Sequence, residues 1–132
     1  MIDFIGAIRA LLAGGIGGAP TVYATGTQAA VVTTEHFLSS PNVAGTFTLV
    51  VDTVNMVVGD VLELRVYQMT ITAGTSRRAL LMTYYGAQPA DELIRISLPI
   101  ANALTDANAL RFSLTQTFGA AGRNFPWSVL RT

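Results

Sequence analysis

A repeated alternation of apolar and polar side chains, with a period of two residues, limits this chain to a narrow set of folds. Alternation of this kind is typical of a β-strand with one face in a core and the other face outside. Five segments show it, and in each we expect the apolar side chains to point inward. These side chains are Phe47, Leu49 and Val51; Leu62, Leu64 and Val66; Ile94, Ile96 and Leu98; Leu110, Phe112 and Leu114; and Phe125, Trp127 and Val129.

Two further segments are less regular. Residues 31–38 are expected to hold a first strand, and residues 79–85 are apolar on both faces. The second segment predicts either a central strand or a strand whose outer face meets another subunit. Turn-forming residues separate the segments: 40–42, 55–60, 73–74, 86–89, 102–108 and 119–122.

Seven or eight short strands at this spacing predict an all-β fold, an antiparallel β-sandwich or barrel, with a jelly roll as the first choice. No alternation of strands with helices indicates a parallel sheet, and no internal repeat is evident. At 132 residues the chain is expected to fold as one sandwich domain over residues 21–132, preceded by an arm and linker over residues 1–20.

The N-terminal residues follow a helical pattern instead. Asp3 can cap a short helix that ends near residue 12, before the glycine-rich linker at 14–18. One apolar stripe along this helical arm is the predicted interface: Phe4, Ile5, Ile8, Leu11 and Leu12. Because a short helix is marginal alone in water, the stripe must rest on its own sandwich or on a neighbouring subunit.

A role for the arm in a membrane is disfavoured. Its polar face lacks the basic patch of a membrane-surface helix, and its apolar run is too short to span a bilayer. Asp3 and Arg9 also argue against an export signal, so the mature chain is expected to begin at or near Met1.

Charge is sparse in this chain. Only 12% of the residues are charged, against about 25% in an average soluble domain. The exterior is therefore made polar by hydroxyl groups, covered by partner proteins, or both. The net charge is zero and the eight basic residues, all arginine, are dispersed, which argues against a nucleic-acid partner. The absence of cysteine excludes disulfides and thiolate metal sites.

No set of residues indicates catalysis. His36 is the single histidine, and Glu35 would point to the opposite face of the same strand, so a structural or surface role is expected. The adjacent pair Asp91 and Glu92 opens a strand and gives no specific indication of a glycosidase.

Binding sites for small ligands are equally weakly indicated. Asp52, Asn55 and Asp60 resemble a calcium loop only in composition, so a plain turn is expected. The glycines at 14–18 do not match a phosphate-binding loop, since no lysine follows them. Phe118, Phe125 and Trp127 could form a sugar-stacking platform, but their spacing favours the core. No catalytic residue, cofactor or metal is therefore predicted.

Four segments resemble small structural proteins of tailed bacteriophages. They are residues 55–67, 85–94, 110–117 and 122–127, within a resemblance that covers about residues 44–131. Capsid cement (decoration) proteins with jelly-roll folds are the closest functional match. The resemblance implies a non-enzymatic virion protein on the capsid exterior. Such a protein binds the major capsid protein and self-associates as a dimer or trimer. Similar sequences also occur in tail components, so a tail or tail-fibre module that binds a receptor or carbohydrate is the alternative.

Overall fold

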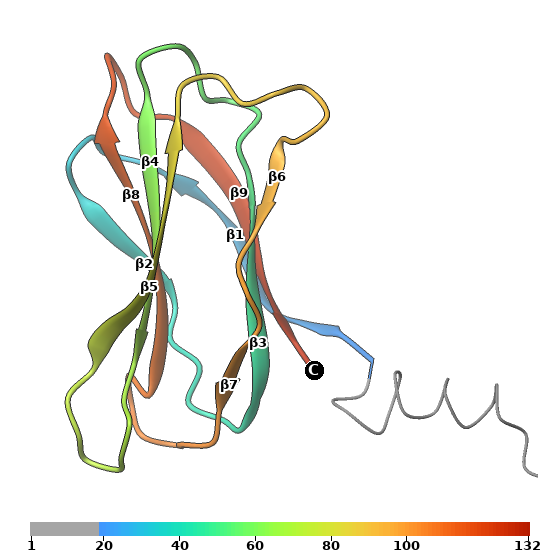
Figure 1. Cartoon of the computed structure of the whole chain (residues 1–132), viewed down its shortest axis with the longest axis vertical. Coiled ribbons are helices and arrows are strands. Elements are labelled where there is room, and N and C mark those ends of the chain that lie inside the picture. The colour runs from blue at the N-terminus through green and yellow to red at the C-terminus, as the bar shows by residue number, and fades with distance from the viewer. Residues whose placement is uncertain (1–18) are drawn as a thin grey trace, which may run out of the picture.

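The computed structural model describes residues 19–132, and every regular element in that range is a β-strand. Nine strands form two antiparallel sheets, which Figure 1 shows side by side. Sheet A has the order β1 (Thr21–Ala29), β9 (Asn124–Arg131), β3 (Gly45–Asp52) and β6 (Ile94–Ile96), and β7 (Ile100–Asn102) also pairs with β3. Sheet B has the order β2 (Glu35–Ser39), β8 (Leu110–Phe118), β4 (Val61–Gln68) and β5 (Arg77–Tyr85). The predicted all-β, antiparallel class is confirmed.

The core lies between the sheets and is built from the alternating residues. Four of the five predicted segments point their apolar side chains inward, as expected. Phe47, Leu49 and Val51 of β3, Leu62, Leu64 and Val66 of β4, Leu110, Phe112 and Leu114 of β8, and Phe125 and Val129 of β9 are fully buried, and Trp127 packs against them. Burial of these side chains is the main favourable contribution to folding, about 25 cal/mol for each Å² of apolar surface removed from water.

The fifth segment has the opposite orientation. Ile94 and Ile96 are 51% and 61% exposed, and Leu98 is 67% exposed, so the prediction that they point inward is wrong. The pairing of β6 with β3 sets Ile96 opposite Val50, an outward residue, and sets Arg95 opposite the buried Val51. The inward position of Arg95 is stabilised by two contacts. Its guanidinium stacks over the Tyr84 ring, 4.9 Å from the centroid, and donates a hydrogen bond to the side chain of Gln88.

The predicted strand at residues 31–38 is only partly correct. The chain turns near Thr33, which has a φ of 72°, and β2 begins at Glu35. The first strand in the structure is β1, a largely exposed strand of sequence TVYATGTQA that lacks a clear apolar alternation. Its order comes from a long pairing with β9, from Thr21 opposite Arg131 to Ala29 opposite Asn124. Tertiary pairing of this kind is invisible to local patterns.

The segment that is apolar on both faces is an edge strand. β5 pairs with β4 and ends sheet B, so the expectation of a central strand is wrong. The other expectation, contact with another subunit, stays a prediction. β8 instead occupies the centre, between β2 and β4, and both of its faces are buried.

Candidate functional site

The outer faces of the two sheets differ sharply in charge, and this difference defines the candidate interface. On sheet A one row crosses four strands: Thr25, Ser128, Val50 and Ile96 are successive register partners. A second row holds Val22, Leu130 and Thr48. None of these seven side chains carries a charge. We call this surface the outer face of sheet A.

A shallow hollow of about 490 Å³ lies on this face. It is lined by Thr25, Gly26, Thr27, Val50, Asp52, Ile94, Pro126, Trp127 and Ser128. Asp52 is the one charged residue in the lining, and one oxygen of its carboxylate already accepts a hydrogen bond from the backbone of Val54. Hydroxyl groups, aliphatic side chains and Trp127 line the rest of the hollow. Such a surface suits contact with another protein more than binding of an ion.

The outer face of sheet B carries an ion-pair network instead. Arg65 pairs with Glu63 on its own strand and with Glu35 on β2, the latter at 3.2 Å. One oxygen of Glu35 also accepts hydrogen bonds from the hydroxyls of Tyr67 and Ser113, each at 2.6 Å. Five side chains from three strands therefore satisfy one another, and Ser113 is the fully buried member of the network.

This network shifts the pKa values of its members. Burial acts to raise the pKa of Glu35, but hydrogen bonds from Ser113, Tyr67 and Arg65 outweigh it and leave that pKa lowered. Burial, together with the hydrogen bond to Glu35, raises the pKa of Tyr67. The hydrogen bond to Glu63 is the largest contribution that raises the pKa of Arg65. The carboxylate of Glu35 thus favours its charged form as the partner of a cation, which is a structural arrangement.

Phe37 extends this face towards the β2 edge. Its ring lies beneath the guanidinium of Arg111, 3.5 Å from the ring centroid, and 5.8 Å from the ring of Tyr67. Arg111 and Phe37 come from neighbouring strands, β8 and β2. The sheet B face is therefore held together by its own charged and aromatic contacts, whereas the outer face of sheet A is not.

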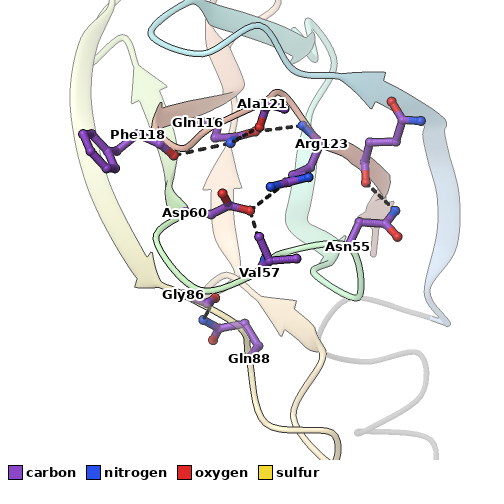
Figure 2. Close-up of polar contacts among 10 residues, drawn as sticks. Asn55, Val57, Asp60, Gly86, Gln88, Gln116, Phe118, Ala121 and Arg123 are labelled. Carbon is purple, nitrogen blue, oxygen red and sulfur yellow. Dashed lines mark hydrogen bonds and ion pairs between the residues drawn. The ribbon is translucent and has the colours of Figure 1, made fainter.

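A second polar network lies at one end of the two sheets and joins them (Figure 2). Asp60 accepts a hydrogen bond from Nε of Arg123 at 2.9 Å and another from the backbone of Val57 at 3.0 Å. Gln116 donates to the carbonyl of Ala121 and accepts from the backbone of Arg123. Asp60 is 1% exposed, so its charge is compensated by a guanidinium and not by water.

The three residues that resemble a calcium loop in composition do not converge on an ion. Asp60 faces Arg123, Asn55 donates its amide to the carbonyl of Asn124, and Asp52 caps its own turn. Within residues 19–132 no group of three potential metal ligands is found. Asp91 and Glu92 lie on an exposed loop, and Glu92 pairs with Arg95 at 3.7 Å. These contacts agree with the expected turns.

His36 and the late aromatics occupy structural positions. Nε2 of His36 accepts a hydrogen bond from the backbone of Val31 at 3.1 Å, which holds the turn before β2. Phe125 is buried and Trp127 packs on the core, while Phe118 is 66% exposed. The three rings therefore do not form one platform, and the preference for the core is confirmed for Phe125 and Trp127.

The predicted interface on the arm lies outside the described residues: Phe4, Ile5, Ile8, Leu11 and Leu12. The Glu35–Arg65–Tyr67 network and the outer face of sheet A were both missed by the sequence analysis. A signal for the first does exist, since Glu63, Arg65 and Tyr67 alternate on the outward side of one strand. Glu35 joins this network only because β2, β8 and β4 lie side by side in sheet B, and the sequence does not show that pairing.

No family model, curated protein or solved structure matches this chain. Among residues 19–132 no helix is long and apolar enough to cross a membrane.

Proposed function

We propose that this protein is a virion structural protein, a capsid cement (decoration) protein that binds major capsid subunits on the capsid exterior. The proposal includes a β-sandwich of the jelly-roll type, a non-catalytic role and self-association. The observation that carries it is the outer face of sheet A, an almost uncharged surface that spans four strands.

The strand order supports the jelly roll. If β6 and β7 count as one interrupted edge strand, the pairs are nested: β1 with β9, β2 with β8, β3 with β6 and β7, and β4 with β5. The first strand pairs with the last, the second with the one before it, and so on inwards. That nesting is the pattern of a long hairpin rolled into two sheets, a fold common among viral capsid proteins.

The contrast between the faces supports docking on another protein. On the outer face of sheet B, the charged side chains of Glu35, Glu63 and Arg65 pair with one another. The outer face of sheet A has no comparable network and leaves Ile94 and Ile96 exposed. Stable interfaces are depleted of charge at their centre, and a shell under internal pressure needs contacts of that kind.

The first experiment counts copies in particles of the phage whose genome encodes this chain. Quantitative mass spectrometry against the major capsid protein is expected to find hundreds of copies in each virion. Cryo-electron microscopy is expected to place them on the head. A handful of copies at the tail would overturn the proposal and favour the receptor-binding or carbohydrate-binding module.

The second experiment tests the docking face. Shells that lack this protein are incubated with the purified full chain, and binding is measured by co-sedimentation. The double variant Thr25→Arg, Ile96→Arg is expected to lose most of the binding, because two unpaired charges would be buried in the interface. Ala87→Arg, on an exposed loop, is the matched control and should bind like the wild type. Equal binding by the double variant would show that sheet A is not the docking face.

A further inference from the structure

The free edge of β5 is the exposed feature that the proposed function leaves unexplained. The described part of the chain has four sheet edges, formed by β1, by β6 with β7, by β2 and by β5. β5 is nine residues long and pairs only with β4 among residues 19–132. Figure 1 looks onto this side of the molecule, where β5 crosses in front of β4.

The other edges carry features that discourage pairing with a further strand. β2 has five residues and a register shift, and β6 and β7 have three residues each and are separated by Ser97, Leu98 and Pro99. β1 has a register shift between Val22 and Ala24. Short strands, bulges and prolines are the usual protections of an exposed edge.

β5 lacks these protections over most of its length. Its one irregularity lies opposite Val66 and Tyr67, near its beginning, and residues 80–85 pair with β4 without interruption. This regular segment, Leu-Leu-Met-Thr-Tyr-Tyr, contains neither a charge nor a proline. A long, regular, uncharged edge readily accepts another strand.

Both faces of β5 would gain from such an addition. Leu80, Met82 and Tyr84 point inward and pack at the margin of the core. On the outward side Leu81 is 41% and Tyr85 is 73% exposed. An added strand would therefore cover apolar side chains on two sides and satisfy the free backbone groups of the edge.

We infer that β5 pairs with β5 of a second copy, antiparallel and about a two-fold axis, so that sheet B continues across both molecules. Charge favours this occupant and this direction. Arg77 and Arg78 lie at one end of β5, and Tyr84 and Tyr85 lie at the other. An antiparallel pair keeps the arginines of the two copies apart, and with its centre at Leu81 it sets them towards the exposed ring of the partner's Tyr85, where a cation–π contact forms. A parallel pair would set the four arginines together.

Symmetry also restricts the register. When the axis is perpendicular to the continuous sheet, inward residues meet inward residues and outward residues meet outward residues. A centre at Leu81, Met82 or Thr83 therefore brings Leu81 opposite Leu81, Leu81 opposite Thr83, or Thr83 opposite Thr83 of the second copy. In each of these three registers, at least one pair of opposed outward residues is therefore made up of Leu81 or Thr83 from both copies.

Disulfide trapping of the full chain tests the pairing. The wild type has no cysteine, so the double variant Leu81→Cys, Thr83→Cys introduces the only thiols. Directly opposed residues in antiparallel strands lie within the range that a disulfide spans. Mild oxidation is expected to give a covalent dimer in any of the three registers. The matched control is Ile94→Cys, Ile96→Cys on the outward side of β6, which should stay monomeric on a denaturing gel. Equal crosslinking of both variants, or none at β5, would overturn the inference.

The mass of the protein in solution gives an independent test. Light scattering after size exclusion is expected to find twice the chain mass of 14.0 kDa for the wild type. Leu81→Lys, Thr83→Lys adds charge to the outward side of the edge and should give a folded monomer with an unchanged circular dichroism spectrum. Ile96→Lys removes a comparably exposed aliphatic side chain from sheet A and should stay dimeric. A wild-type monomer, or a dimer that survives the β5 variant, would contradict the pairing.

This inference does not depend on the capsid role. Loss of shell binding by the sheet A variants with the dimer intact would separate the two surfaces. A dimer that fails to bind shells would contradict the proposed function alone.

Discussion

The guanidinium of Arg123 lies 2.9 Å from the carboxylate of Asp60, and this pair joins the two sheets at one end of the molecule. Asp60 immediately precedes β4 of sheet B, and Arg123 immediately precedes β9 of sheet A. The carboxylate is 1% exposed and the guanidinium 24% exposed. Removal of one partner from a buried pair leaves the other charge uncompensated.

Asp60→Ala is therefore expected to lower the free energy of unfolding by about 3 kcal/mol. The change also removes the acceptor of the Val57 backbone N–H. Urea denaturation of the purified chain measures the effect. Asp91→Ala, on an exposed loop, is the control and should change stability by less than about 0.5 kcal/mol. An equally small change in the free energy of unfolding for Asp60→Ala and Asp91→Ala would show that the Asp60–Arg123 pair contributes little to stability.

Gly119→Ala is expected to be more destabilising than Gly59→Ala. A Cβ at Gly119 would lie 2.6 Å from Oδ1 of Asp60 and closer still to Nε2 of Gln116. Gly59 has a positive φ of 94° but nothing within 4 Å of its added Cβ, so it reports backbone strain alone. We expect about 1 kcal/mol at Gly59 and about 2–3 kcal/mol at Gly119, where overpacking is added. Equal losses would contradict the crowding at Gly119.

Stability should depend on pH at both ends of the range through the sheet B network. The pKa of Glu35 is lowered in the folded state, so its contribution is complete above its ordinary value of 4.5 and is lost as pH falls through the folded pKa. The pKa of Tyr67 is raised, so its contribution is complete below 10 and is lost as pH rises towards the folded pKa. Urea midpoints measured from acid to alkaline pH should show both declines.

Glu35→Gln is the control for this profile. It removes the carboxylate that accepts from Tyr67 and Ser113. The acid decline should become shallower in this variant, and the alkaline decline should become smaller because the charge of Glu35 is one cause of the raised pKa of Tyr67. An unchanged profile would mean that other groups set the pH dependence.

The orientation of β6 can be tested by comparing neighbouring side chains. Arg95→Ala removes the stacking on Tyr84 and the hydrogen bond to Gln88, and we expect a loss of about 1 kcal/mol. Ile96→Ala removes an exposed side chain and should cost less than about 0.5 kcal/mol in the isolated protein. Chemical denaturation of the two variants gives the comparison. A larger loss at Ile96 than at Arg95 would restore the inward orientation predicted from the alternation.

The all-β class, most turns and the inward residues of four segments follow from the local amino-acid pattern. They do so because alternation with a period of two marks the two sides of a strand, and burial keeps the apolar side in the core. Phe47 and Leu49 of β3 and Leu62 and Leu64 of β4 follow this rule without exception.

Contacts between distant segments determine which alternating side of β6 is inward, that β1 is a strand, and that the segment at 79–85 lies at an edge. Ile96 and Arg95 follow the register with β3, and β1 is ordered by β9, more than a hundred residues later in the chain. The almost uncharged outer face of sheet A likewise gathers Thr25, Val50 and Ser128 from three distant segments. Alternation shows that a strand has an apolar side and a polar side. The partner strands determine which side meets the core and which residues lie together on each outer face.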